Sequence, residues 1–468
     1  MTHSVTDTSS PSLLTMFDNA PLTPHYWVLM IVLIVHSVIM LFDFFIVGFL
    51  ISIVGPIWHL TYGHTSVILL SGGVGQIIGS MALSRASDQW GRKPILILSM
   101  MLYAVSAGSV SLIPDGGWLY FSMLQFLVGF GYGGVGAAQL TLIVELTPTR
   151  YRTFMSSASG IFAPLGVFLA SVLVGFLLPV FGWRGVAAVG FTPILIAVSL
   201  IFLAPESVRW LLSHGENERA RKIIAQYLKK PVEEVPLPYA KPIQKRKIRM
   251  RDLYSRSYRG QFWAIVIMST GISIAGFGVQ LWGPTIISLL LNITASAAAR
   301  YFIWISLAGV LGRLLFTILP ATIGRWKSAM ISSWLAAFAL ACAAIFHSTF
   351  LMGLPVFFLC LLVGALAWDG GFVNIVPYST ELYPVHLAGQ GTGLCQACSG
   401  LGKLIGPAIL ALVAGAGTVL SPKATSASIL PGFLLLSAFC VAGGVALSFL
   451  RYETHGKPMV VETEDAVR

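Results

Sequence analysis

The chain has 468 residues, of which 56% are hydrophobic and only 10% are charged, and its mean hydropathy is +0.82. So few charges cannot cover the surface of a soluble protein of this length, so we expect a polytopic membrane protein. The formal net charge of +11 could indicate nucleic-acid binding, but Lys and Arg are concentrated in alternate loops. That positive-inside bias indicates a basic surface facing lipid headgroups and argues against a nucleic-acid partner.

The first part of the chain contains six apolar runs long enough to span a bilayer, which takes about 20 residues. Residues 1–26 precede them as a polar tail without the basic start of a cleavable signal peptide, so the first span is predicted to serve as an uncleaved signal. The six runs, which form an N-terminal bundle over residues 27–204, fall at 27–55, 66–84, 94–113, 118–144, 153–179 and 184–204.

A long polar stretch, residues 205–259, separates these runs from a second set of six, and it is predicted to be a cytoplasmic linker with short surface helices. The second set forms a C-terminal bundle over residues 260–451, followed by a cytoplasmic tail, 452–468. Its runs fall at 260–291, 300–320, 328–346, 350–379, 388–416 and 429–450. The basic loops place both termini and the linker in the cytoplasm.

The two halves carry the same short motifs at the ends of apolar runs. Residues 88–93 read Asp-Gln-Trp-Gly-Arg-Lys, and residues 321–327, about half the chain later, read Ala-Thr-Ile-Gly-Arg-Trp-Lys. Residues 145–148 read Glu-Leu-Thr-Pro, and residues 381–384 read Glu-Leu-Tyr-Pro. Repetition at half length predicts two related membrane bundles, an architecture typical of carriers that alternate access around a site between the halves.

Ionisable residues inside apolar runs are functional candidates, because a buried charge costs several kcal/mol unless it is paired or hydrated. Asp43 and His36 lie two helical turns apart on one face, which suggests a protonation site with a relay. The alternatives are a structural carboxylate and a packing histidine. Lys403 could attract a substrate carboxylate, or it could form a permanent salt bridge, for example to Asp369. Arg313 is predicted to snorkel at the cytoplasmic end as a structural residue.

The five cysteines all lie inside apolar runs. Cys395 and Cys398 have the spacing of a redox or zinc pair, but no second pair accompanies them. We therefore predict small packing residues, with no metal and no cofactor. The sequence also lacks a nucleophile triad or a large signalling tail, which argues against an intramembrane enzyme or a sensor.

Residues 88–93 resemble the signature loop of the Major Facilitator Superfamily, in which the Asp caps a neighbouring helix and latches the outward-facing state. Residues 205–212, Pro-Glu-Ser-Val-Arg-Trp-Leu-Leu, resemble a stretch of sugar porters and organic-ion transporters, with a departure at Val208. Residues 278–285 lack the glutamines of sugar porters. They and residues 42–49 are similar to aromatic-acid/proton symporters and synaptic-vesicle-type relatives, which carry an acid at the position of Met40 and an Arg at that of Gln125.

The resemblance implies an all-α membrane protein with twelve transmembrane helices in two pseudo-symmetric six-helix bundles. It implies a transporter, not an enzyme, that takes up a small organic anion, aromatic or otherwise, together with protons across a bacterial-type inner membrane. A sugar or polyol carrier and an exporter of organic cations or drugs remain alternatives. The expected partners are the anionic substrate, protons and the lipid bilayer, and we expect a monomer.

The candidate residues fall into two groups. Besides the proton-coupling candidates Asp43 and His36, the substrate-binding candidates are Lys403, Asp369, Gln125, Gln280, Trp282, Trp368, Phe372, Asn374 and Tyr378. The gating or latch candidates are Asp88, Gly91, Arg92, Lys93, Glu145, Arg152, Glu206, Arg209, Arg325 and Glu381. Among them, we expect Glu145, Arg152, Glu206, Arg209 and Glu381 to form cytoplasmic ion-pair clusters.

Overall fold

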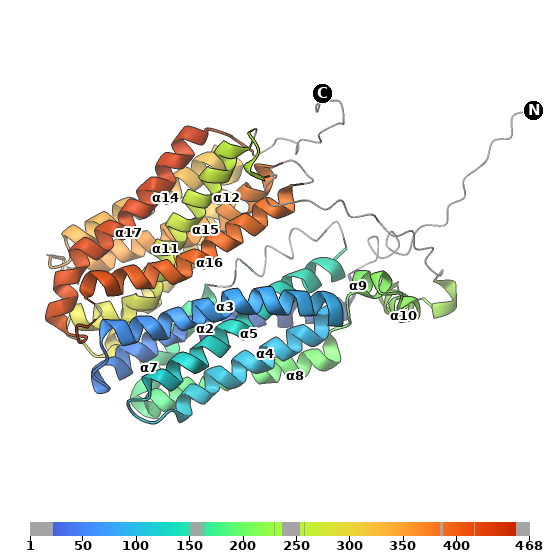
Figure 1. The fold of residues 1–468 in the computed structure, drawn as a ribbon, viewed down its shortest axis with the longest axis horizontal. Coiled ribbons are helices and arrows are strands. Elements are labelled where there is room, and N and C mark those ends of the chain that lie inside the picture. Colours follow the sequence, from blue (N-terminus) through green and yellow to red (C-terminus); the bar gives the residue numbers. More distant parts are fainter. Residues whose placement is uncertain are drawn as a thin grey trace, which may run out of the picture.

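The computed structural model describes residues 22–148, 151, 160, 162, 164–228, 230–235, 253–256, 258–383, 387–415 and 417–454, and long helices dominate it (Figure 1). The first half contains α2 (Pro24–Ile57), α3 (Tyr62–Trp90), α4 (Arg92–Ser109), α5 (Trp118–Leu146), α7 (Leu165–Ala188) and α8 (Pro193–Leu203). Two 3₁₀ turns, η1 (Val110–Leu112) and η3 (Val189–Phe191), extend α4 and join α7 to α8. The predicted linker contains α9 (Val208–Ser213), α10 (Asn217–Leu228) and η4 (Val232–Glu234).

The second half repeats this pattern. Its helices are α11 (Arg259–Leu290), α12 (Ala295–Ile318), α13 (Pro320–Ile323), α14 (Arg325–Ile345), α15 (Val356–Glu381), α16 (Ala388–Ala414) and α17 (Pro422–Leu450). Two short strands, β1 (Phe350–Leu351) and β2 (Leu354–Pro355), form an antiparallel hairpin before α15. The predicted span 350–379 therefore starts six residues too early, because Gly353 permits a tight turn at φ 81°.

The prediction of an all-α protein with twelve spans is confirmed. Within the described residues, eleven helical stretches are long and apolar enough to cross a membrane, and one of them, Leu165–Leu203, contains 39 residues. Gly182 breaks this stretch with φ 63° and ψ 179°, a conformation that suits glycine, and the break divides it into two spans.

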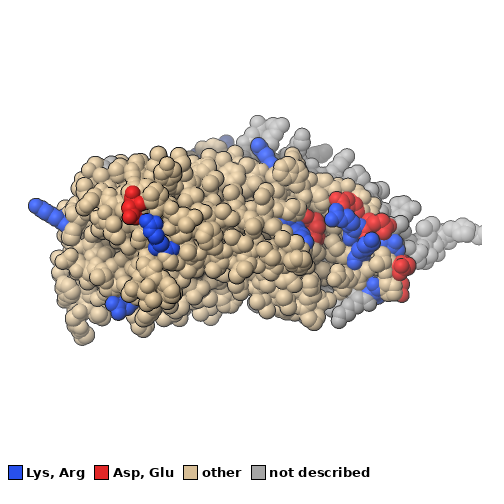
Figure 2. Space-filling model, turned by 90° about the horizontal axis from the view of Figure 1, so that it is seen from below, with Lys and Arg blue, Asp and Glu red and all other residues tan. Residues whose placement is uncertain are grey.

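The surface of the bundle is apolar around its middle. Large hydrophobic side chains in the middle parts of the long helices, such as Phe176, Trp304 and Phe338, are between 58% and 67% exposed. Figure 2 shows the charged side chains near the two ends of this face, with a wide uncharged band between them. An apolar band of this kind is stable in contact with lipid, so these side chains face the bilayer.

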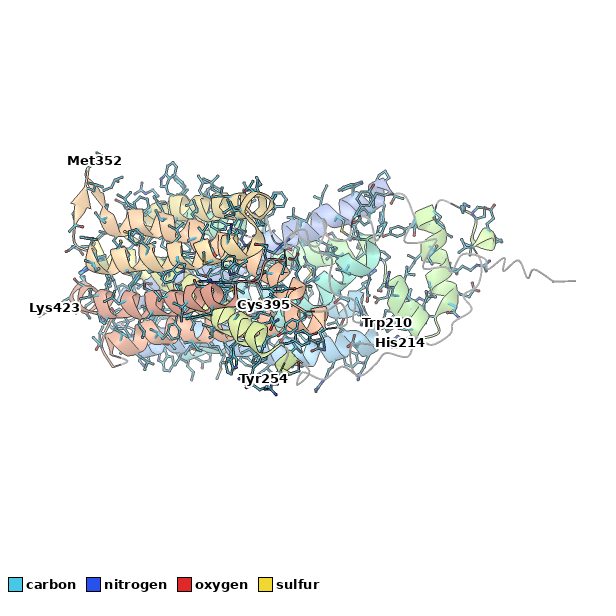
Figure 3. All side chains as sticks on the ribbon, turned by 90° about the horizontal axis from the view of Figure 1, so that it is seen from above. Trp210, His214, Tyr254, Met352, Cys395 and Lys423 are labelled. Carbon is cyan, nitrogen blue, oxygen red and sulfur yellow. The ribbon has the colours of Figure 1, made fainter. Side chains whose placement is uncertain are left out.

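The two ends of the molecule are distinguished by their loops. Trp210 and His214 of α9 and the turn after it mark one end, which we call the linker end, while Met352 of the β-hairpin and Lys423 at the start of α17 mark the far end (Figure 3). The halves meet along α2 with α11, α3 with α16, and α7 with α12.

Glycines allow helices near this interface to approach closely. A Cβ on Gly129 of α5 would lie 1.9 Å from the carbonyl oxygen of Gly72 on α3, and one on Gly406 of α16 would lie 2.4 Å from that of Ile274 on α11. These backbones are in direct contact, as is usual where small residues line membrane helices. The close packing fixes α16, and with it Lys403, against α11.

Candidate functional site

Lys403 lies near the middle of α16, in a cage formed by both halves. Its Nζ is 5.2 Å from the ring centroids of Phe44 (α2) and Tyr132 (α5), and 4.9 Å from that of Phe277 (α11). It also donates a hydrogen bond of 2.9 Å to Oε1 of Gln76 on α3. Cation–π contacts within about 6 Å stabilise an ammonium group but do not neutralise it. The cage therefore holds a cation that retains its net charge and part of its exposed surface.

Asp43 is the residue before Phe44, a member of the cage, on α2. Its side chain is buried, at 3% exposure, and neither carboxylate oxygen has a hydrogen-bond partner among the described residues. An ionised carboxylate in such a position is costly unless it is compensated, so this group can be expected to take up a proton or a ligand. Asp43 thus remains a candidate for proton binding.

His36, two turns before Asp43, is fully hydrogen-bonded. Its Nδ1 lies 2.5 Å from Oε1 of Gln139, and its Nε2 lies 2.8 Å from the hydroxyl of Tyr103. The amide of Gln139 in turn donates to Oγ of Ser37 at 2.8 Å. These contacts hold α2, α4 and α5 together, which favours the packing alternative for this histidine. Tyr103 is also within electrostatic range of Asp43, so the network borders the candidate proton site.

A second buried charge centre lies in the C-terminal half. Asp369 of α15 pairs with Arg313 of α12 at 3.4 Å through Oδ1, and it accepts a hydrogen bond of 3.1 Å from Gln280 of α11 through Oδ2. Arg313 also donates to the carbonyl of Gly160 in the other half. The predicted snorkelling of Arg313 is wrong, because its side chain is only 12% exposed and turns inward to this acid.

The sequence left open a salt bridge between Asp369 and Lys403. In the structure Asp369 pairs with Arg313 instead. A small pocket borders this centre, and its lining includes Gln280, Trp368 and Asp369. Tyr132 of the Lys403 cage lies within electrostatic range of Arg313, so both cations lie near the same tyrosine.

The remaining substrate-binding candidates lie at four different positions. Phe372 packs against Phe277 of the Lys403 cage at 5.6 Å. Trp282 stacks on Tyr62 toward the far end, and Gln125 packs against Gly72 of α3 inside the first half.

Asn374 and Tyr378 lie away from the cage, at the linker end. The side-chain amide of Asn374 donates a hydrogen bond of 3.2 Å to the backbone carbonyl of Arg325. The hydroxyl of Tyr378 donates a hydrogen bond of 2.7 Å to the backbone carbonyl of Tyr452. These bonds tie α15 to the start of α14 and to the segment after α17, which favours a structural role for both residues.

The latch candidates of the first half meet where α3 turns into α4. Arg92 pairs with Asp88 at 2.8 Å and approaches Glu145 of α5 at 3.5 Å. The carboxylate of Glu206 accepts the backbone N–H groups of Arg92 at 3.0 Å and of Lys93 at 3.3 Å. The acid that caps the next helix is therefore Glu206, while Asp88 serves as an exposed partner of Arg92.

Gly91 makes this turn possible. Its φ of 106° is unfavourable for other residues, and a Cβ there would lie 2.3 Å from the Glu206 carboxylate. Arg209 follows on α9, and Arg152 lies outside the described residues.

The second half builds the same arrangement without an Asp88 equivalent. Arg325 pairs with Glu381 at 3.0 Å, and Gly324 has φ 93°. Glu453, which follows α17, accepts the backbone N–H groups of Arg325 at 2.8 Å and of Trp326 at 3.3 Å. Glu453 is thus the structural counterpart of Glu206.

Sequence reasoning missed Glu453 and the residues that surround Lys403, namely Gln76, Phe44, Tyr132 and Phe277. The position of Glu453, directly after the last helix as Glu206 follows the sixth, could have identified it. Phe44 could have been suggested by its position beside Asp43, but the other three come from distant helices and carry no local motif. Among the described residues, no group of three His, Cys, Asp or Glu side chains could hold a metal ion.

Two pseudo-symmetric helical bundles with buried charges at their interface define a membrane transporter. The chain belongs to the Major Facilitator Superfamily, whose family model matches residues 32–407. It is thus a member of a family of transporters and not an enzyme.

Similar proteins include the niacin transporter NiaP of Acinetobacter baylyi, which is 23% identical over 85% of this chain and 89% of that protein. The synaptic vesicle 2-related protein of Pongo abelii is 26% identical over 86% and 73%, and the cis,cis-muconate transport protein of A. baylyi is 25% identical over 74% and 77%. Among solved structures, the xylose transporter XylE of E. coli in a partially occluded inward-open conformation shares the fold. Its TM-score is 0.69 at 16% identity, over 93% of this chain and all of that one.

Proposed function

We propose that this protein takes up a small organic anion together with a proton, by alternating access of a site between the two halves. One observation carries the proposal. Lys403 keeps its net charge among neutral partners, while Asp43, the residue before Phe44 on α2, has no hydrogen-bond partner among the described residues. The unneutralised cation suits a carboxylate, and the isolated acid suits a proton.

The charges described at membrane depth suggest a stoichiometry. Arg313 and Asp369 neutralise each other, which leaves Lys403 and Asp43. When Asp43 carries a proton, the site has one net positive charge, and one carboxylate neutralises it. One proton would therefore accompany one monocarboxylate, because an uncompensated charge at this depth is costly.

The names of two similar proteins support an organic-acid substrate, since niacin is a monocarboxylate and cis,cis-muconate is a dicarboxylate. The charge balance at this site favours an acid of the first kind. The three rings around Lys403, together with Phe372, would offer stacking surface to a planar acid. For an organic cation, the same lysine would be repulsive. Lys403→Glu tests the charge preference of the cavity. The variant should lose anion uptake, and a gain of cation uptake would show that the charge at position 403 selects the substrate.

We further propose that the linker end faces the cytoplasm and that the far end faces outward. Basic residues at the linker end, among them Arg92, Lys93 and Arg325, support this orientation through the positive-inside rule.

The proposal is tested by uptake into proteoliposomes of labelled niacin and cis,cis-muconate, with and without an imposed pH gradient, acidic outside. We expect the gradient to raise uptake of at least one acid in the parent protein and to have no effect on Asp43→Asn. Uptake that ignores the gradient and survives that substitution would refute proton coupling. A thermal-shift screen against carboxylates, sugars and amines would identify the substrate class, because a ligand that binds the folded protein raises its melting temperature.

A further inference from the structure

A short backbone bridge joins the two halves at the far end. Two hydrogen bonds, of 2.9 and 3.1 Å, link the turn between α2 and α3 to the turn between α16 and α17. They place Thr61 opposite Val419 as an antiparallel pair. Because the bonds flank the pair instead of joining it, the two Cα atoms should be about 4.5 Å apart. The bridge therefore fixes the distance between the halves at this point.

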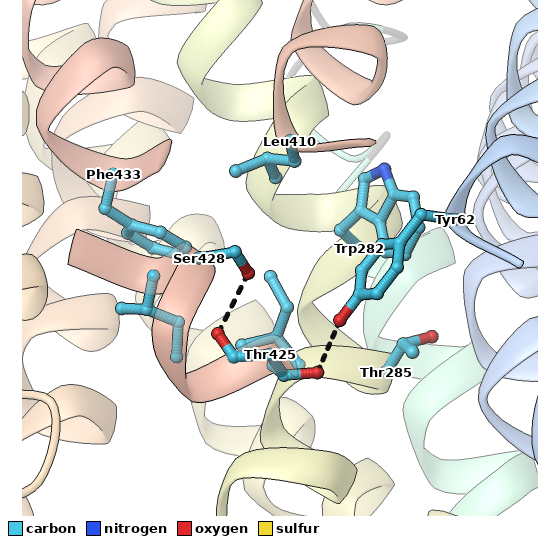
Figure 4. A pocket seen from close by; sticks show the side chains of 9 residues that line it. Tyr62, Trp282, Thr285, Leu410, Thr425, Ser428 and Phe433 are labelled. Atoms are coloured by element: carbon cyan, nitrogen blue, oxygen red, sulfur yellow. Dashed lines mark hydrogen bonds between the residues drawn. The ribbon is translucent and has the colours of Figure 1, made fainter. Parts of the chain in front are cut away.

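Tyr62, the next residue, closes the same end with its side chain. Its hydroxyl shares a hydrogen bond of 2.7 Å with Oγ1 of Thr425 on α17, and its ring stacks on Trp282 of α11 at 5.4 Å (Figure 4). Tyr62 belongs to the first half, whereas Thr425 and Trp282 belong to the second. The contact would have to break if the halves separated here.

A small pocket lies behind Tyr62, between α11, α16 and α17. Figure 4 shows Thr285, Thr425 and Ser428 around it, with Phe433 on the other side. Thr285 is 2% exposed, and its hydroxyl has no hydrogen-bond partner among the described residues. A buried polar group without a hydrogen-bond partner is costly, so the Thr285 hydroxyl would gain from contact with water. Water could reach it if the far end of the molecule opened.

Trp282 connects this end to the helix that carries Lys403. Its indole N–H donates to the carbonyl of Pro407 on α16 at 3.0 Å. Proline has no N–H, so the carbonyl of Lys403, four residues earlier, lacks its usual helical donor. The helix α16 is therefore weakened at Lys403, one turn before the proline that Trp282 contacts. Lys403 is the residue to which we assign the binding of the substrate carboxylate.

We propose that the Thr61–Val419 pair and the Tyr62–Thr425 contact form a gate at the far end, and that Trp282 links this gate to the α16 segment around Lys403. In the proposed orientation the gate closes the external route to the cavity. The inference rests on the proposed function for its direction and for the role of Lys403, but not on the identity of the substrate.

The first experiment locks the gate with a disulfide. In a variant whose five native cysteines are replaced, Thr61→Cys and Val419→Cys should form a bond on oxidation, since disulfides need Cα atoms about 4.4–6.8 Å apart. Oxidation should reduce uptake at least tenfold, and reductant should restore it. The single-cysteine variants are the controls. Uptake by the double variant in its reduced form tests the proposed transport function separately from the gate. Unchanged uptake after complete cross-linking, or failure to cross-link, would overturn the gate.

The second experiment measures opening without a substrate. A cysteine at Thr285 is labelled in whole cells with a membrane-impermeant maleimide, and Val419→Cys, at a residue 47% exposed, checks that the far end faces outward. Tyr62→Phe should raise the labelling rate at position 285 roughly two- to tenfold, as expected for the loss of one hydrogen bond. The matched control is Tyr120→Phe, at a residue 63% exposed. An unchanged rate in Tyr62→Phe would count against the gate.

The link to Lys403 is tested by a double-mutant cycle with the same readout. Lys403→Gln should change the labelling rate at position 285, and Trp282→Phe, which keeps a ring but removes the indole N–H, should reduce that change. Non-additive effects would support the link, because residues that act through one contact are coupled. Additive effects would show that the gate and the Lys403 segment are independent.

Discussion

Nζ of Lys403 and Oε1 of Gln76 are joined by a hydrogen bond of 2.9 Å that runs from α16 in the second half to α3 in the first. The partner is neutral, so an incoming carboxylate would compete with an amide and with aromatic rings, not with a protein carboxylate. The bond also makes the cation part of the interface between the halves. A ligand that binds Lys403 would therefore change contacts of both bundles, as alternating access requires.

The first prediction concerns this pair. Gln76→Glu should place a carboxylate beside Lys403, neutralise the site and lower affinity for organic anions at least tenfold, although the lysine is unchanged. Lys403→Gln should have an effect at least as large. Uptake and ligand-induced thermal shifts measure both, with Lys423→Gln, an exposed lysine at the far end, as the control. Unaltered anion binding in Gln76→Glu would exclude Lys403 as the binding group.

The second prediction concerns the pH dependence of uptake. If Asp43 must be protonated before the anion is carried, initial uptake should rise as the external pH falls in the parent protein. In Asp43→Asn the side chain is permanently neutral, so the profile should become flat. Counterflow, which needs no net proton movement, should persist in the variant. A profile that keeps its slope would assign coupling to another group.

The fold was largely predictable because the relevant signals are local. Apolar runs, basic loops and two copies of the Gly-Arg turn can all be read along the chain, and they predict twelve spans in two related halves. The errors concern helix ends and the hairpin at 350–355, where Gly353 decides the local conformation. Lipid-facing apolarity continues through such turns, so hydropathy alone does not mark them.

The site was less predictable because partners come from distant helices. Lys403 and Asp43 stand out as charges in apolar runs, but no pattern indicates that the rings near Lys403 come from α2, α5 and α11. Arg313 was placed by its distance from the cytoplasmic end. The side chain of Arg313 turns inward because Asp369 lies on a neighbouring helix, and the sequence does not reveal that these two helices are neighbours.

The third prediction concerns the buried pair. Arg313→Gln should leave Asp369 without its charged partner and lower stability by about 3–5 kcal/mol, the usual cost of an uncompensated buried charge. Adding Asp369→Asn should recover much of the loss, because both groups are then neutral. Melting temperatures of the purified variants in detergent measure the effect. The electrostatic explanation fails if the double variant is less stable than Arg313→Gln alone.

The fourth prediction concerns the acids that cap the helices after the two Gly-Arg turns. Glu453→Ala should lower stability by about 1 kcal/mol, since two backbone N–H groups at the start of α14 lose their acceptor. Glu206→Ala should act in the same way on α4.

Gly324→Ala should be damaging for a related reason, because its Cβ would lie 2.2 Å from the Glu453 carboxylate at a φ of 93°. If both changes act through one contact, Gly324→Ala and Glu453→Ala should be less than additive in melting temperature, with Glu234→Ala, an exposed acid, as the control. Full additivity would mean that backbone strain alone explains the glycine. In that case Glu453 would have no part in the requirement for glycine at this turn.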